Sequence, residues 1–128
     1  MIAQNHVGGI VGLVSGANAE VTTCINHANV QGYYCVGGIA GAVKAGAEVH
    51  LSANYGDVKG NGIIGGVAGR VSTTGMYSNG SAKECEVYDV YNLGQVSGYG
   101  TTAGSEMGGI VGEAGYENWK QEHCLRCR

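Results

Sequence analysis

One hexapeptide recurs four times in this chain and restricts the possible folds more than any other feature. Each copy consists of an apolar residue, two glycines, Ile or Val, Val or Ala, and a third glycine. The copies begin at Val7, Val36, Ile64 and Met107, so their starts are 29, 28 and 43 residues apart. Such periods are typical of solenoids, propellers and other repeat arrays. We therefore expect a fold assembled from equivalent units.

A second motif lies between the hexapeptides and keeps its own spacing. It has the frame E-V-x4-N-x3-V-x-G and begins at Glu20, Glu48 and Glu86. Its Asn precedes the next Gly-Gly pair by 11 positions in the first two repeats and by 16 in the third. The same Asn follows its own Gly-Gly pair by 18, 17 and then 27 positions. The third repeat thus carries two insertions, between Val71 and Glu86 and between Gly98 and Met107, which we expect to be loops outside a constant repeat unit.

Each repeat is predicted to form two or three short strands. Apolar residues do not recur at i, i+3, i+4 and i+7 free of glycine, so helical repeats are excluded. The hexapeptide and the next two residues form the first predicted strand, with Ile10 and Val14 facing inward and Gly12 leaving room for close packing or a bend. Solvent is expected to contact Leu13, Ala42, Arg70 and Glu113. A second strand runs from Glu-Val to the Asn, with inward-facing Val21, Val49 and Val87.

The recurrent Asn suits a corner, because this residue tolerates the left-handed backbone region. Stacked copies are expected to pair their amides as a ladder, formed by Asn26, Asn54 and Asn92. A propeller blade needs roughly 40 residues, a length that only the third repeat reaches. We therefore predict an all-β fold, a parallel β-helix (β-solenoid) of about four rungs in which one rung has enlarged loops. Residues 1–128 form one domain, with repeats near 7–35, 36–63, 64–106 and 107–128, the last incomplete or a cap.

Composition agrees with β-structure and excludes two classes of partner. The chain has 25 glycines, which alternate with Val and Ile at fixed offsets, a pattern that disordered segments rarely show. The net charge is −3 and the seven Lys and Arg residues are scattered, so no basic stripe can neutralise a nucleic-acid backbone. The longest apolar stretch, from Val7 to Val14, is far shorter than the ~20 residues of a membrane span. We predict neither nucleic-acid binding nor membrane insertion.

The start of the chain indicates a piece of a longer protein. Met1 is followed at once by repeat-like sequence, without the features of a secretory signal peptide. The first repeat opens at Val7 with no capping element, although solenoids need caps over their end rungs. We expect a fragment of a longer secreted protein whose open strand edges promote end-to-end self-association.

The Gly-Gly-Ile/Val-x-Gly core, followed by an Asn turn and V-x-G, resembles the GLUG motif from Val7 to about Gly115. GLUG arrays occur in large bacterial surface and secreted proteins, including adhesin-like proteins and IgA-cleaving metalloproteases, where the repeats lie outside the catalytic domain. The resemblance therefore implies an extracellular or cell-surface location as part of a longer protein. The chain departs from the pattern in its enlarged third repeat and in the polar tail from Tyr116 to Arg128, which lacks another Gly-Gly pair.

The five cysteines do not indicate a metal or redox site. Their odd number leaves at least one thiol free. Cys24 aligns with Ser52 and Val90, which indicates a small core position. Cys35 could form a disulfide with Cys24 or with Cys85, and the sequence does not decide between these two pairings. The C-x-x-C from Cys124 to Cys127 stands alone, without the second pair that a zinc site needs.

No constellation of side chains indicates catalysis, a cofactor or a metal. The histidines do not recur at one repeat position, and neither do Asp57 and Asp89. The three frame glutamates are expected to form an exposed column, more simply explained as a solvated strand start than as a cation site. Carbohydrate-cleaving β-helices group several carboxylates and basic residues on one face, whereas Asp57 and Asp89 occupy different repeat positions. We predict that this chain is not an enzyme.

Tyrosine supplies the remaining candidate for function. The chain has eight tyrosines and Trp119, which can stack on sugars or fill corners. Turns before Gly-Gly contain Tyr33, Tyr34 and Tyr99, and the first insertion contains or adjoins Tyr77 and Tyr88. We predict a structural or adhesive segment with a host glycan or protein as partner, and specific binding at the two insertions. The alternative is an accessory domain of a secreted protease or glycan-active hydrolase whose active site lies outside this chain.

Overall fold

The part of the chain described by the computed structural model consists of strands and turns. The described residues are 6–72, 84–99 and 106–115. Their strands pair in parallel, which confirms the predicted all-β class. Within these ranges, no helix has the length and apolar character that crossing a membrane requires.

The strands belong to four sheets, which we name A to D. Sheet A contains β1 (His6–Gly8), β6 (Cys35–Gly37), β10 (Ile63–Gly65) and β14 (Glu106–Gly108). Sheet B contains β2 (Val11–Ser15), β7 (Ala40–Lys44), β11 (Ala68–Ser72) and β15 (Val111–Gly115). Sheet C contains β3 (Glu20–Thr22), β4 (Ile25–Asn26), β8 (Glu48–Asn54) and β12 (Glu86–Asn92). Sheet D contains β5 (Val30–Gln31), β9 (Val58–Gly60) and β13 (Val96–Gly98).

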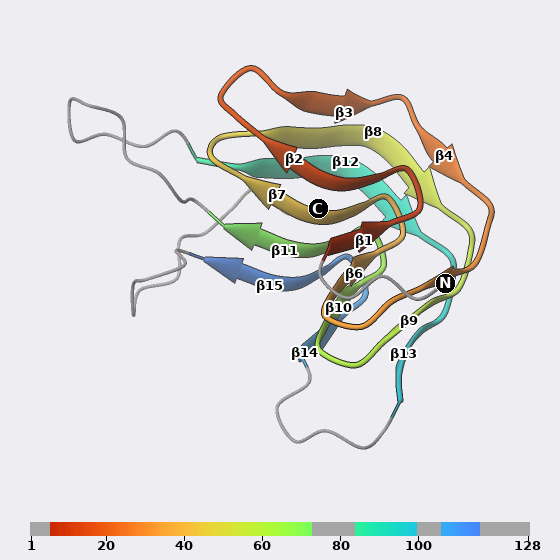
Figure 1. The fold of residues 1–128 in the computed structure, drawn as a ribbon. Coiled ribbons are helices and arrows are strands. Elements are labelled where there is room, and N and C mark those ends of the chain that lie inside the picture. Colours follow the sequence, from red (N-terminus) through yellow and green to blue (C-terminus); the bar gives the residue numbers. More distant parts are fainter. Residues whose placement is uncertain (1–5, 73–83, 100–105, 116–128) are drawn as a thin grey trace.

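Equivalent positions of successive repeats lie side by side in these sheets. Val36 of β6 pairs with Val7 on one side and with Ile64 on the other. Figure 1 shows the same stacking for β2, β7, β11 and β15, which lie one below the other. The period of the sequence is therefore also the period of the strands.

The insertions of the third repeat leave this register unchanged. Before the first insertion Ser72 pairs with Lys44, and after it Glu86 pairs with Glu48. Across the second insertion, the strands before and after it, β13 and β14, pair with β9 and β10 at equivalent positions. This confirms a constant repeat unit, while residues 73–83 and 100–105 of the expected loops lie outside the described residues.

The hexapeptide forms a corner between two sheets, so the prediction that it lies in one strand was wrong. In the second repeat, β6 ends at Gly37 and β7 begins at Ala40. A Cβ atom on Gly37 would lie 2.0 Å from the carbonyl oxygen of Ala40, a separation that only glycine allows. Because of this corner, the second repeat has four strands, β6 to β9, rather than two or three.

The third glycine brings sheets A and B into contact. A Cβ atom on Gly41 would lie 2.5 Å from the backbone nitrogen of Val7 and 2.7 Å from the carbonyl oxygen of Gly12. At Gly69 a Cβ atom would lie 2.7 Å from the backbone nitrogen of Val36. Any side chain at this position would force the backbones apart, which confirms the close packing expected there.

The second glycine makes room for the recurrent Asn. In the first three repeats, a Cβ atom on the second glycine would come within 3 Å of an Asn side chain, in the pairs Gly9–Asn26, Gly38–Asn54 and Gly66–Asn92. The closest of these approaches is 2.2 Å, from Gly38 to Cγ of Asn54. The two sequence motifs thus contact each other across the interior.

The Asn side chains form the predicted hydrogen-bonded ladder, which we call the Asn ladder. Nδ2 of Asn26 donates to Oδ1 of Asn54, and Nδ2 of Asn54 donates to Oδ1 of Asn92, both at 2.8 Å. Each Nδ2 also donates to the carbonyl oxygen two residues later, at 2.7 to 2.9 Å. Asn54 is fully buried, so these bonds satisfy amide groups that water does not reach.

The left-handed backbone lies three residues before each ladder Asn and not at the Asn itself. The expectation that Asn is needed at the corner for its tolerance of left-handed backbone was therefore wrong. The φ angles of Thr23, Leu51 and Asp89 are 57°, 49° and 50°. These residues occupy one repeat position, and no ladder Asn has a positive φ angle. Asn is therefore required for its side-chain amide and not for backbone tolerance.

Leu51→Gly is expected to raise the free energy of unfolding by about 0.5 to 1 kcal/mol, because glycine relieves the strain of left-handed backbone. Leu51 is 57% exposed, so little apolar burial is lost. Leu51→Val is the matched control and is expected to destabilise, since a β-branched residue tolerates this region poorly. Urea denaturation measures both variants. A glycine variant less stable than the valine variant would contradict the assigned backbone.

Two apolar clusters fill the interior on either side of the Asn ladder. Sheets B and C enclose the larger cluster, and sheets A and D enclose a smaller one formed by Val30, Val36, Val58 and Ile64. Ile39 of the second repeat is fully buried, whereas its counterpart Ile10 in the first repeat is 46% exposed. The inner repeats are therefore covered by neighbours on both sides, and the outer ones only on one.

The predicted solvent face of the first strand is right for Leu13 and wrong for Ala42. Leu13 is 46% exposed, whereas Ala42 is fully buried. Ala42 pairs with Leu13 on one side and Arg70 on the other, and these longer side chains can cover its methyl group. Arg70 also forms an ion pair with Glu113, with Nη2 3.1 Å from Oε1.

Candidate functional site

Two columns of side chains flank the Asn ladder on the outer surface. Successive residues of a strand face opposite sides, so the residues next to each inward Asn face outward. The register of β4, β8 and β12 aligns the preceding residues as one column, Ile25, Ala53 and Tyr91. The following residues form the second column, His27, Tyr55 and Leu93.

A groove of about 240 Å³ lies where the first column meets the left-handed bend. We call it the corner groove, and it is lined by Ile25, Leu51, Ser52, Ala53, Asp89 and Tyr91. Ala53 is only 3% exposed and lies between two larger side chains of its column, so it forms the floor. Ile25, Leu51 and Tyr91 are each about half exposed and form walls. The groove therefore offers apolar surface to solvent together with one carboxylate, that of Asp89.

An aromatic cluster adjoins the corner groove and consists of His27, Tyr55 and Tyr91. The rings of His27 and Tyr55 stack with centroids 4.9 Å apart, and Tyr91 meets Tyr55 edge to face at 5.9 Å. The two tyrosine hydroxyls are 2.7 Å apart, and this hydrogen bond is the main cause that raises the pKa of Tyr55 above 10.0. The raised pKa keeps the Tyr55 phenol neutral at neutral pH, so this ring adds no negative charge to the cluster.

The predicted glutamate column lies at the other end of sheet C. Glu48 pairs with Glu20 and with Glu86. Oε2 of Glu20 lies 3.0 Å from Nε2 of His50, and the His50 ring stacks on Tyr88 at 4.8 Å. In the described ranges, no group of three or more His, Cys, Asp and Glu side chains could hold a metal ion.

A second groove, more polar than the first, lies on the outer face of sheet D. Its volume is about 240 Å³ and its lining is Asn29, Val30, Gln31, Asp57, Lys59, Gln95 and Ser97. Oδ1 of Asn29 accepts from the backbone nitrogen of Asp57, and Oδ1 of Asp57 accepts from that of Gln95, both at 2.9 Å. Nζ of Lys59 lies 5.1 Å from the centroid of the Tyr99 ring. Amide, carboxylate and ammonium groups thus line a face that adjoins the corner groove across the Asn turn.

Among the described residues, no disulfide joins Cys35 to Cys24 or to Cys85, the two partners considered from the sequence. Cys24 is only half buried, whereas its counterparts Ser52 and Val90 are 3% and 7% exposed. Cys24 belongs to the first repeat, which pairs on one side only among the described strands, and this explains its exposure. The C-x-x-C lies outside the described residues.

Sequence reasoning identified some exposed tyrosines and missed those that line the corner groove. Tyr33 and Tyr34 are about half exposed in the turn before Gly-Gly, as predicted. Tyr88 lies within β12, beside the first insertion, and Tyr77 falls outside the described residues. The positions next to the recurrent Asn were the signal that could have found the missed residue Tyr91, because neighbours of an inward-facing strand residue face outward.

Known proteins give no independent assignment. No protein-family model, no curated protein and no solved structure matches the chain.

Proposed function

We propose that this chain is a non-enzymatic, structural and adhesive segment of a secreted or cell-surface bacterial protein. In this proposal the four parallel sheets are the sides of a β-solenoid of about four rungs that resembles GLUG arrays. One observation carries the proposal. The residues that repeat, such as the glycines and the Asn ladder, hold the rungs together, whereas the corner groove is built from positions that differ between rungs.

This division of roles suits a scaffold that displays a binding surface. Repeat proteins stack equivalent units and vary the exposed side chains on one face. The corner groove supplies aromatic and aliphatic surface, and the adjoining polar groove supplies amide and carboxylate groups. Binding sites commonly combine apolar walls with a few polar groups. A host glycan, or a host protein, is the partner that such a surface would engage.

Tyr91→Ala is expected to weaken binding to an immobilised mucin or glycan by about tenfold or more, which corresponds to about 1.4 kcal/mol. Tyr91 contributes a wall of the corner groove and the partner of the Tyr55 hydroxyl. Tyr33→Ala is the matched control, because Tyr33 is exposed to a similar extent, 52% against 49%, and does not line the groove. A glycan array followed by surface plasmon resonance on the positive ligands provides the measurement.

The result can contradict the proposal in two ways. If the wild-type protein binds no glycan, mucin or host-cell surface protein, the adhesive role is contradicted. If Tyr33→Ala and Tyr91→Ala weaken binding equally, the corner groove is not the binding surface. Circular dichroism of all three proteins separates lost binding from lost folding.

A further inference from the structure

Sheets C and D end one strand earlier than sheets A and B in the described part of the chain. The outermost strands of sheets A and B are β14 and β15 of the fourth repeat, whereas those of sheets C and D are β12 and β13 of the third. The described structure therefore ends unevenly, and we call this end the step. In it, β14 and β15 of the fourth repeat extend one strand beyond β12 and β13 of the third.

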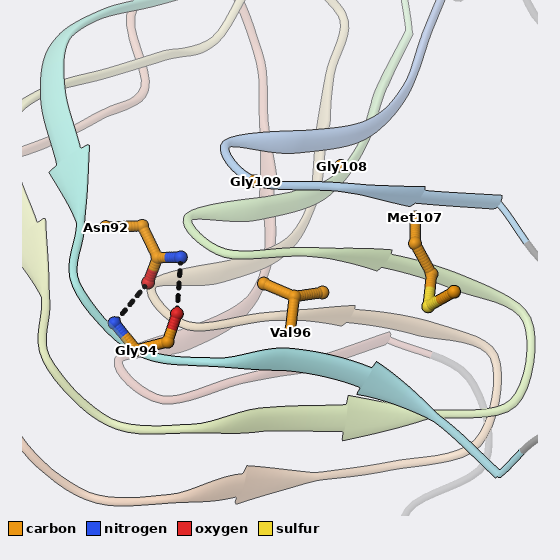
Figure 2. Close-up of a pocket in the computed structure, with 6 residues that line it drawn as sticks. All are labelled: Asn92, Gly94, Val96, Met107, Gly108 and Gly109. Carbon is orange, nitrogen blue, oxygen red and sulfur yellow. Dashed lines mark hydrogen bonds between the residues drawn. The ribbon is translucent and has the colours of Figure 1, made fainter.

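A cavity of about 330 Å³ lies in this step. It is lined by Asn92, Gly94, Val96, Met107, Gly108 and Gly109. Figure 2 shows the side chains of Val96 and Met107 pointing toward one another across it, with the amide of Asn92 hydrogen-bonded to Gly94. The lining thus combines the end of the Asn ladder, one Gly-Gly pair and two apolar side chains, those of Val96 and Met107.

The polar groups of the step lack the partners that their counterparts have. Nδ2 of Asn54 donates to Gly56 and to the next ladder Asn, whereas the hydrogen bond described for Nδ2 of Asn92 goes to Gly94 at 2.9 Å. A Cβ atom on Gly109 would meet nothing within 4 Å, although the equivalent atom on Gly38 would lie 2.2 Å from Asn54. The place that an Asn side chain fills in each earlier repeat is open here.

The apolar groups of the step are also uncovered. Val96 is partly exposed, whereas its counterpart Val58 is fully buried. Met107 is 55% exposed, whereas its counterparts Val36 and Ile64 are fully buried. One further strand on sheet C and one on sheet D would complete both apolar and polar contacts at once.

We propose that this step is an acceptor site for an Asn-turn segment, a polypeptide stretch that carries the second sequence motif. The segment has the frame E-V-x4-N-x3-V-x-G and adds parallel strands beside β12 and β13. Its Asn accepts from Nδ2 of Asn92 and packs on Gly109, and its valine covers Val96 and Met107. The proposal rests on the stacked architecture of the proposed function and adds the chemistry of one partner.

A peptide with the sequence of residues 48–60 is the probe, labelled with fluorescein and added to the full 128-residue chain. Saturable binding is expected by fluorescence anisotropy. The same peptide with Asn54→Ala is expected to bind at least about tenfold more weakly, because it cannot accept from Asn92. The decisive protein variant is Gly109→Ala. Its methyl group meets no atom in the free protein, yet it would occupy the place of the incoming Asn.

We expect Gly109→Ala to unfold at the same denaturant concentration as wild type and to bind the peptide at least about tenfold more weakly. Absence of binding to a wild-type chain with an intact β-type circular dichroism spectrum overturns the acceptor site, and the glycan experiment remains a separate test of adhesion. Binding that Gly109→Ala leaves unchanged also overturns it, because the peptide then binds elsewhere. Gly109→Ala is expected to leave glycan binding unchanged, because the corner groove does not contain Gly109. The adhesive role and the acceptor site can therefore fail independently.

Discussion

Gly38→Ala is expected to abolish cooperative folding of the chain. The added Cβ atom would lie 2.2 Å from Cγ of Asn54 and 2.3 Å from the carbonyl oxygen of Gly66. One of these contacts is with backbone of the next repeat, and the other is with a fully buried side chain held by hydrogen bonds, so neither can move without breaking the stack. The expected loss exceeds about 4 kcal/mol, a large part of the stability of an ordinary domain.

Gly109→Ala provides the control for this variant, because it makes the same chemical change at the same repeat position. Nothing lies within 4 Å of the Cβ atom that it adds. Thermal and urea unfolding, followed by circular dichroism, are expected to show a transition for Gly109→Ala and none for Gly38→Ala. Equal stability of the two variants would contradict the packing of the second glycine against the Asn ladder.

Asn54→Ala is expected to lower the free energy of unfolding by about 3 kcal/mol or more. Its amide accepts from Asn26 and donates to Asn92 and to the carbonyl oxygen of Gly56, and the residue is fully buried. Each buried polar group left without its partner costs about 1 to 3 kcal/mol. Urea denaturation of wild type and variant gives the difference directly.

Asn29→Ala is the matched control for the ladder variant. Asn29 also bridges two repeats, because its Oδ1 accepts from the backbone nitrogen of Asp57, but this bond is exposed to water. Its loss is expected to cost less than about 1 kcal/mol. If Asn29→Ala and Asn54→Ala destabilised equally, burial of the Asn ladder would not be the source of its contribution.

The all-β class and the unit of repetition could be predicted because both follow from spacing. Gly-Gly pairs that recur along the chain indicate that backbones approach closely at the same position of each repeat. The pairing of Val36 with Val7 and Ile64 shows that the repeats are also equivalent in space. The corner inside the hexapeptide could not be predicted in this way. A run such as Val36 to Gly41 suits an extended strand as well as a corner, and only the contact of Gly37 with the Ala40 carbonyl decides between them.

The positions beside the recurrent Asn are marked in the sequence, but the shape of the corner groove that they form could not be predicted from it. Its floor exists because Ala53 is smaller than its neighbours Ile25 and Tyr91, and that comparison requires the register of three strands. The left-handed bend was missed for a related reason. Thr23, Leu51 and Asp89 share no side-chain chemistry, so their common backbone conformation leaves no pattern in the sequence.

The stacking of repeats through the Asn ladder is the central claim, and nuclear Overhauser contacts between Asn side-chain amides test it most directly. In protein labelled with ¹⁵N at Asn, the amide protons of Asn54 are expected to show contacts to Asn26 and to Asn92, which lie on either side of it. No contact is expected between Asn26 and Asn92, because Asn54 separates them. A direct contact between those two residues, or no contact of Asn54 with either, would contradict the stacked parallel arrangement.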